Sequence, residues 1–520
     1  MTASTLLAQG ADIPAPHIEY DQLGPTLLVF GAALVGVLVE AFAGRAARFG
    51  AQVTLTALGL VGALGWTIWL AADSKPHHVA AEGAIGVDGP TLFLQGTILI
   101  LAILSLMLIA ERRNAHFTAQ ASALPGTEAE QETTAAGIVQ TEVFPLMLFA
   151  VGGMLMFPAS NDLLTMFVAL EVMSLPLYLL CGLARRRRLL SQEAAVKYFL
   201  LGAFSSAFFL YGTALLYGYA GSVRLGDIAA QLDKDAGSET LLLAGVALLS
   251  VGLLFKLGAV PFHMWKPDVY QGAPTPITAL MASCTLVAAF GAMLRVYYVG
   301  LEHLKWDWRP AMWGVAILTM VAGAIIAITQ TDLKRMLAYS SIAHAGFLLT
   351  GVIATSTDGL SSTLFYLVAY GFTTIGAFAV ITMVRDTGGE AAHLSRWAGL
   401  GKRSPVVAGA FAFFLLAFAG IPLTSGFTGK FAVFKAAVEA GATPLVVVGV
   451  LSSAIAAFFY VRVIVVMFFS EPEADGPTVV AAPVTAAAVA LGLAATVVLG
   501  VLPQPVLDLA GHAATQMFVR

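Results

Sequence analysis

Long apolar runs recur along nearly the whole chain, and they constrain its fold more than any other feature. A membrane-spanning α-helix needs about 20 apolar residues to cross about 30 Å of hydrocarbon. Of the 520 residues, 58% are hydrophobic and 11% are charged, whereas soluble domains carry about 25% charged residues. This excludes a soluble enzyme, a nucleic-acid-binding protein and a disordered scaffold, and the runs are too long for the strands of a membrane β-barrel. We therefore predict an all-α, polytopic membrane protein.

Fourteen apolar segments are long enough to span a membrane. They cover residues 24–43, 51–72, 91–110, 141–158, 162–183, 194–220, 240–270, 275–299, 311–329, 335–354, 360–385, 404–441, 445–470 and 480–502. Helix-breaking residues occur in two of them, namely Gly258, Pro261 and Pro267 in the seventh and Gly420, Pro422 and Gly426 in the twelfth. Because proline removes a backbone donor and clashes with the preceding turn, we expect both helices to break inside the membrane.

The sixth and seventh segments resemble the eleventh and twelfth. Lys197-Tyr-Phe-Leu-Leu-Gly parallels Phe365-Tyr-Leu-Val-Ala-Tyr, and Leu257-Gly-Ala-Val-Pro parallels Phe418-Ala-Gly-Ile-Pro. The copies are five spans apart, so they cross the membrane in opposite senses, and inverted repeats with broken helices are typical of transport pathways near the midplane. We divide the chain into N-terminal helices (1–140), a first five-helix repeat (141–310), an inverted second repeat (311–470) and a C-terminal helix (471–520).

Loop charges predict the orientation of the chain. Loops after odd-numbered spans hold fifteen Lys and Arg residues, Lys266 among them, and the other side holds six. The odd loops should therefore face the cytoplasm. Both termini then lie outside, on the periplasmic side of a bacterial inner membrane. The run 185–188 is explained most simply as a topology anchor. The first 21 residues contain no Lys or Arg, so they lack the charged start of a signal peptide and should stay on the protein. The polar stretch 111–140 should be a flexible loop.

Several charged residues lie inside the spans, where one charge costs about 2.5–3.5 kcal/mol. Glu171 is near the middle of the fifth span, Lys256 directly precedes the seventh-span break, and Lys430 follows the twelfth-span break. Burial disfavours a lysine's ammonium form and a nearby carboxylate favours it, so such a pair can hold a proton with adjustable affinity. We favour a functional role for all three. Lys435, about a turn further out, should extend toward the membrane surface.

Other polar residues near the breaks leave two interpretations open. Lys334 is either an interfacial cation or part of the polar path. His344 and His263 could each relay protons through both ring nitrogens or be hydrogen-bonded core residues. Arg462 should pair with a neighbour. Together, Glu171, Lys256, His344 and Lys430 would form a hydrophilic axis through the membrane.

The sequence contains no pattern for a cofactor. Two cysteines, Cys181 and Cys284, are too few for an iron–sulfur cluster and lie in apolar runs. We find no phosphate-binding loop, dinucleotide fingerprint, metal constellation or nucleophile–base set. We therefore expect no cofactor, metal or redox centre in this chain.

Four motifs resemble the antiporter-like subunits of respiratory complex I, the bacterial NADH–quinone oxidoreductase. They are residues 193–206, 255–276 (containing Trp265-Lys-Pro-Asp-Val-Tyr), 330–347 and 420–431. The resemblance covers about residues 140–470, and the Asp-Val-Tyr and Gly-Phe-x-Gly-Lys forms are most similar to the N-type subunits. It implies proton translocation through this chain, with NAD, flavin, iron–sulfur clusters and quinone bound by partner subunits. It also implies M-type and K-type neighbours, contact with lipids and no nucleic acid.

The resemblance also implies residue roles. Glu171 matches the family's glutamate of span five, and Lys256 and Lys430 match the lysines of the broken spans. The family often has a lysine in span eight, where this chain has Leu286. Either water fills that step or Lys334 and His344 substitute for the lysine. A subunit of a multi-subunit sodium–proton antiporter is the alternative, since that family shares the fold, and a non-pumping scaffold is a third possibility.

Overall fold

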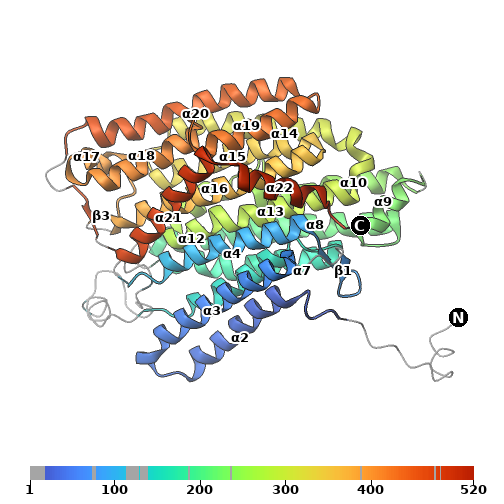
Figure 1. The fold of residues 1–520 in the computed structure, drawn as a ribbon, viewed down its shortest axis with the longest axis horizontal. Coiled ribbons are helices and arrows are strands. Elements are labelled where there is room, and N and C mark those ends of the chain that lie inside the picture. Colours follow the sequence, from blue (N-terminus) through green and yellow to red (C-terminus); the bar gives the residue numbers. More distant parts are fainter. Residues whose placement is uncertain are drawn as a thin grey trace.

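Long helices packed side by side make up nearly all of the protein (Figure 1). The computed structural model describes residues 18–72, 78–112, 117, 128, 139–184, 188–234, 237–386, 389–472, 476–480 and 482–519. Our expectations for the first residues of the chain, and for most of the 111–140 loop and the 185–188 run, lie outside these residues.

Twelve helical segments within the described residues are long and apolar enough to cross a membrane. They are α2 (Gly24–Phe42), α3 (Arg45–Ala72), α4 (Gly89–Ile109), α7 (Leu163–Cys181), α8 (Arg188–Ala220), α10 (Glu239–Leu257), α12 (Thr275–Leu280) continuing into α13 (Leu286–Arg295), α14 (Lys305–Ile328), α15 (Leu333–Ala354), α16 (Thr357–Met383), α20 (Thr443–Phe469) and α21 (Pro483–Val501). Two apolar helices are shorter, α6 (Val143–Met156) and α18 (Pro405–Ala419). The all-α polytopic plan is confirmed. Each of the fourteen expected segments overlaps one of these helices, and twelve of the helices among the described residues have the length and composition of a span.

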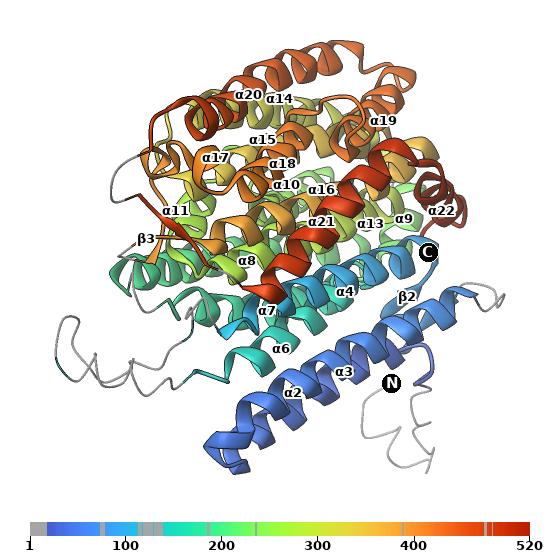
Figure 2. The same ribbon diagram turned by 60° about the vertical axis from the view of Figure 1, so that its left-hand side comes forward.

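The centre of the molecule is formed by three of the spans. The α12–α13 span and α15 are buried along their whole apolar windows, and α16 is nearly so. By contrast, α2, α3, α20 and α21 bury only about a third of theirs. Figures 1 and 2 show the α2–α3 pair and α20 on opposite sides of the bundle. The outer helices can therefore face lipid or partner chains, while the inner ones enclose polar residues.

Short elements lie at the two ends of the bundle (Figure 1). At one end are the antiparallel strands β1 (His78–Ala80) and β2 (Ile85–Val87), with α9 (Leu225–Leu232) and α22 (Gln504–Thr515). At the other end are α17 (Leu400–Arg403) and a sheet in which β3 (Val384–Asp386) pairs antiparallel with both β4 (Gly389–Glu390) and β5 (Thr478–Val479).

Both predicted helix breaks are present. Helix α10 ends at Leu257, Gly258 adopts a left-handed conformation (φ 70°), and α11 (Trp265–Gly272) begins seven residues later. Helix α18 ends at Ala419, Gly420 is again left-handed (φ 83°), and α19 (Ser425–Glu439) follows. Glycine has no Cβ to oppose this conformation, which commonly ends helices.

Two of the residues that we expected to break these helices do not. Pro267 is the third residue of α11, where its missing N–H costs nothing because the first turn has no intrahelical acceptor. Gly426 lies inside α19, and a Cβ there would be 1.9 Å from the Ala417 carbonyl oxygen. It is needed for the close approach of α19 to α18.

A fully buried ion pair and its hydrogen bonds join four distant parts of the chain. Arg295 at the end of α13 donates from Nη2 to Asp88 Oδ2 at 2.7 Å, and both side chains are completely inaccessible. Arg295 Nε donates to the Pro158 carbonyl (2.7 Å), while the Val519 N–H donates to Asp88 Oδ2 (3.1 Å). Asp88 also caps the start of α4 by accepting from the Thr91 N–H.

Removing the charge of Asp88 should destabilise the protein strongly. In Asp88→Asn the Arg295 guanidinium stays buried without its counter-charge, which typically costs about 3–5 kcal/mol. We expect a clear fall in the midpoint of thermal unfolding of the detergent-purified protein, followed by tryptophan fluorescence. The matched control is Asp508→Asn, because Asp508 is exposed and contacts only Gln504 among the bonds that we resolve. Equal midpoints for the two variants would contradict this account.

Candidate functional site

The five predicted site residues lie on four neighbouring spans. Lys256, Lys334, His344 and Lys430 are all buried, with 5% of the side chain or less exposed. Glu171 on α7 is partly buried, and its Oε1 atom is enclosed. Charges this deep are expensive, so each must be stabilised by specific neighbours.

Lys256 lies in an aromatic cage near the end of α10. Its Nζ is 5.8 Å from the centre of the Tyr178 ring and 5.3 Å from that of Tyr198, distances at which an aromatic face attracts a cation. The two rings meet edge to face, with centroids 4.7 Å apart. Among the described residues, Lys256 Nζ has no hydrogen-bond partner.

Glu171 is within electrostatic reach of Lys256, but the two form no direct ion pair in the described part of the chain. A carboxylate that attracts an ammonium without touching it can change its influence through small movements, because the Coulomb energy depends on distance and local dielectric.

Trp265 fixes the geometry of this cage. Its ring stacks on Tyr198 with centroids 4.7 Å apart and planes 10° apart. Its Nε1 donates to the Phe255 carbonyl at 2.9 Å, near the end of α10. Trp265, the first residue of α11, thus contacts both the Tyr198 ring of the cage and the end of α10. It thereby links the two half-helices to each other.

Lys266 is the buried cation that our sequence interpretation placed wrongly. We counted it among the loop cations, but it is only 2% exposed, and its Nζ donates to the Leu257 carbonyl at 3.0 Å. The chain turns at Gly258, so Lys266 near the start of α11 reaches back to the end of α10. The sequence offered one signal for this burial, namely that Lys266 lies between the glycine–proline break and the next span.

Lys430 binds the second break in a similar way. Its Nζ donates to the carbonyls of Phe418 (2.8 Å) and Ala419 (3.1 Å) and to Ser453 Oγ (2.8 Å). It also lies 4.9 Å from the centre of the Phe347 ring. The carbonyls at the end of a helix carry partial negative charge, so they stabilise the ammonium.

His344 on α15 lies between hydroxyl groups. Its Nδ1 is 2.7 Å from the Tyr366 hydroxyl and its Nε2 is 3.4 Å from the Tyr460 hydroxyl. Its ring also contacts the rings of Phe347 and Phe418. The Phe347 ring and the Phe418 carbonyl both contact Lys430 as well. A ring with a hydroxyl at each nitrogen can accept a proton on one side and release one on the other.

Lys334 lies at the opposite end of α11 from Lys266. Its Nζ donates to the Ala273 carbonyl (2.7 Å) and to Thr275 Oγ1 (3.0 Å), and it forms a 3.5 Å ion pair with Glu390. It is buried at the second position of α15, whose start Asp332 caps.

Polar residues near Lys334 extend toward the β3–β4 end of the bundle. Asp268 pairs with Lys197 (2.7 Å) and with Arg335, and these side chains are about a quarter to two fifths exposed. The cluster therefore places partly exposed charges on α8, α11 and α15, next in sequence to the buried Lys334.

The structure also places the other residues that the sequence singled out. Arg462 donates to the Ile328 carbonyl (2.8 Å). The Lys435 side chain is 65% exposed. His263 is buried, and its Nδ1 has no hydrogen-bond partner in the parts that the structure describes. Cys181 and Cys284 are buried, free thiols. The described residues contain no group of three or more potential metal ligands.

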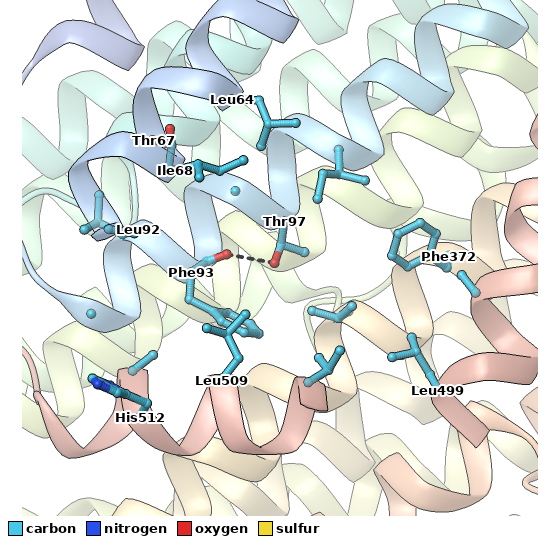
Figure 3. A pocket seen from close by; sticks show the side chains of 18 of the residues that line it. Leu64, Thr67, Ile68, Leu92, Phe93, Thr97, Phe372, Leu499, Leu509 and His512 are labelled. Carbon is cyan, nitrogen blue, oxygen red and sulfur yellow. Dashed lines mark hydrogen bonds between the residues drawn. The ribbon is translucent and has the colours of Figure 1, made fainter. Parts of the chain in front are cut away.

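One apolar cavity is separate from these charges. It has a volume of about 640 Å³ and lies between α3, α4, α16, α21 and α22. Figure 3 shows its apolar lining, which includes Ile68, Phe93, Phe372 and Leu509, with His512 at one edge. It contains none of the buried cations, so the candidate site is the line of charged residues and not this cavity.

Comparisons with known proteins identify the family of the chain. The family profile described as NADH:quinone oxidoreductase/Mrp antiporter, TM, matches residues 160–456. The chain belongs to this family. The matched range includes Glu171 and both helix breaks, so all five predicted site residues lie within the family region.

Named relatives are similar along their full length. NADH-quinone oxidoreductase subunit N of Rhodococcus opacus is 65% identical, over 99% of each chain. The subunit N of Mycobacterium tuberculosis is 60% identical, over 96% of this chain and 99% of its own.

Solved structures share the fold. A chain of Thermus thermophilus respiratory complex I with bound aureothin is 33% identical and has a TM-score of 0.76, over 94% of this chain and 99% of its own. A chain of the Mrp complex of a Dietzia species has a TM-score of 0.80 over 96% and 97%, but at 23% identity it supports the fold alone.

A methyl group at Gly420 should disturb the second break of this family member. In Gly420→Ala the new Cβ would lie 3.1 Å from Lys430 Cδ, and the left-handed backbone costs a non-glycine residue about 1–2 kcal/mol. We expect a lower midpoint of thermal unfolding. Gly409→Ala, on the same broken span in α18, is the control, because a Cβ there meets nothing within 4 Å. A Gly420→Ala midpoint at or above that of the control would disprove the strain.

Proposed function

We propose that this chain is a proton-translocating subunit of the membrane arm of a bacterial NADH–quinone oxidoreductase. Its full-length similarity to proteins named NADH-quinone oxidoreductase subunit N supports this function. Its likeness to a chain of a respiratory complex I supports the same assembly. The chain would act as part of a translocase and carry no redox centre of its own.

One observation carries the proposal, namely the set of buried titratable residues on α7, α10, α15 and α19. Glu171 is within electrostatic reach of Lys256, and His344 is within electrostatic reach of Lys430. A scaffold would gain nothing from burying several cations, each of which costs free energy. Neutral residues could pack the same helices at lower cost.

Proton movement in this scheme is driven from outside the chain. Electron transfer in partner subunits changes the influence of Glu171 on Lys256, and Lys256 then releases its proton toward His344 and Lys430. Moving one charge against 100 mV costs about 2.3 kcal/mol. Changes in ion pairing and desolvation of buried groups reach this size, so a modest movement near Glu171 suffices.

In this scheme, Lys334 supplies protons to the buried residues. Its ion pair with Glu390 and the nearby Asp268 cluster connect the β3–β4 end to the buried line. The family's span-eight position is occupied by Leu286, which is buried and cannot carry a proton.

The proposed assembly follows the family. M-type and K-type subunits are the neighbours, lipids contact the outer helices, and NAD, flavin, iron–sulfur clusters and quinone are bound by other subunits. The membrane is the bacterial inner membrane, with both termini on the periplasmic side. The repeats 141–310 and 311–470 are the two functional halves, flanked by 1–140 and 471–520.

A sodium–proton antiporter subunit is the alternative, and fold similarity alone supports it. Purifying the tagged chain in mild detergent distinguishes the two. A large complex with NADH-dependent quinone reduction and flavin and iron–sulfur spectra supports our proposal. A redox-silent assembly that exchanges sodium for protons in vesicles would overturn it.

The variant Lys256→Ala should assemble but translocate fewer protons. A positioned acid–base group contributes about 10²-fold or more to proton transfer, so transfer through this chain should be lost. The measurement is proton uptake per NADH oxidised in vesicles containing the purified complex. Unchanged proton stoichiometry would reject the relay, and an effect on assembly alone would indicate a structural role.

The variant Lys430→Met should have the same effect at the far end of the line. Methionine keeps the length and apolar stem of lysine but holds no proton. The matched control is Lys435→Met on the same helix, because that side chain is exposed and only weakly paired with Glu439. Proton uptake should fall in the first variant and stay normal in the second. If both variants pump normally, Lys430 is not in the path.

A further inference from the structure

The two helix breaks have the same local geometry around a lysine. In the first, Lys266 Nζ lies 3.3 Å from where a Cβ of Gly258 would be, and in the second Lys430 Nζ lies 3.3 Å from the equivalent position at Gly420. Lys266 binds the carbonyl of the residue directly before its glycine, and so does Lys430. The structural counterpart of Lys430 in the first repeat is therefore Lys266, and not Lys256.

Sequence spacing hides this correspondence. Lys266 follows its left-handed glycine by eight positions, and Lys430 follows by ten. Lys256 instead precedes Gly258 by two positions, and the equivalent place before Gly420 is occupied by Phe418. The match depends on where the ammonium groups lie in space, at the carbonyl end of a half-helix.

We propose that Lys266 is a further proton-carrying residue, acting between Lys256 and His344. This inference rests on the proposed function, since it adds a residue to the same path. Lys266 is 2% exposed and forms no ion pair with a carboxylate of the described residues. Its resolved bond is to the neutral Leu257 carbonyl, and the Tyr270 ring lies 5.8 Å from its Nζ.

The bond to Leu257 suits a group that changes its protonation state. An ammonium has three N–H donors, and the neutral amine that remains after one proton leaves still has two. Lys266 can therefore keep its hydrogen bond to the helix end in both states. The carbonyl end of α10 favours the charged form and burial favours the neutral form, so neither state is fixed by the surroundings.

Other titratable residues of the path lie near Lys266 in space or in sequence. His344 is within electrostatic reach of Lys266 in the first break and of Lys430 in the second. Lys256 directly precedes the residue to which Lys266 binds. His263, whose Nδ1 is buried, belongs to the same break.

The transfer balances as a sequence of single proton movements. The Lys256 ammonium gives one proton to the Lys266 amine and becomes neutral. The Lys266 ammonium then gives one proton to the neutral imidazole of His344. The imidazolium releases one proton toward Lys430, and Lys266 returns to its amine form.

Two substitutions separate proton carrying from helix capping. Lys266→Gln keeps a donor for the Leu257 carbonyl but holds no proton. Lys266→Arg keeps both the charge and the donors but does not deprotonate in proteins. We expect both variants of the whole complex to assemble, to keep the thermal midpoint and to reduce quinone with uncoupler present. Proton uptake per NADH should be lost for the step through this chain. The control is Lys402→Gln, since Lys402 is exposed and pairs at the surface with Glu471.

Proton uptake of the Lys256→Gln variant is measured in the same assay and compared with that of the two Lys266 variants. If that variant loses proton uptake and both Lys266 variants keep it, the inference on Lys266 is wrong and the proposed function stands. If Lys256→Gln also pumps normally, the relay itself is wrong. If one Lys266 variant misfolds, the other decides, and normal pumping by either folded variant overturns the inference.

Discussion

A helix that ends inside a membrane leaves carbonyl groups without partners, and hydrocarbon offers none. This constraint shapes the centre of the molecule. At the end of α10 the free carbonyls are bound by Trp265 and Lys266, and at the end of α18 by Lys430. The helix break leaves carbonyl oxygens without donors, and a buried ammonium needs acceptors. Each therefore offsets the desolvation cost of the other.

The charged line follows from this solution. Helix ends attract ammonium groups, and aromatic faces from Tyr198 and Phe347 shield them without neutralising them. A carboxylate in direct contact would hold each ammonium in one state. Glu171 acts on Lys256 from a distance instead, and the histidine between the breaks is held by tyrosine hydroxyls. Weak stabilisation at each step lets a proton move along the line.

The sequence was sufficient to predict the helices, both breaks and the burial of Lys256, His344 and Lys430, because apolar runs, glycine–proline pairs and isolated charges are local signals. It failed where the outcome depended on distant segments. Lys266 was assigned to a loop because nothing local shows that α11 returns beneath α10. The burial of Lys334 depends on Glu390, which comes from a strand much later in the chain. Pro267 was read as a breaker because its place in the first turn of a new helix was unknown.

The Asp88–Arg295 pair has a consequence for biosynthesis. Asp88 accepts a hydrogen bond from the backbone of a residue 431 positions later, and the Phe518 ring lies 4.6 Å from the Arg295 guanidinium. Chains are made from the N-terminus at about 5–20 residues per second. The contacts of Asp88 and Arg295 with residues 518 and 519 can therefore form only after the ribosome has synthesised these residues. A nascent chain held before that point has its helices but lacks the contact that closes one end of the bundle.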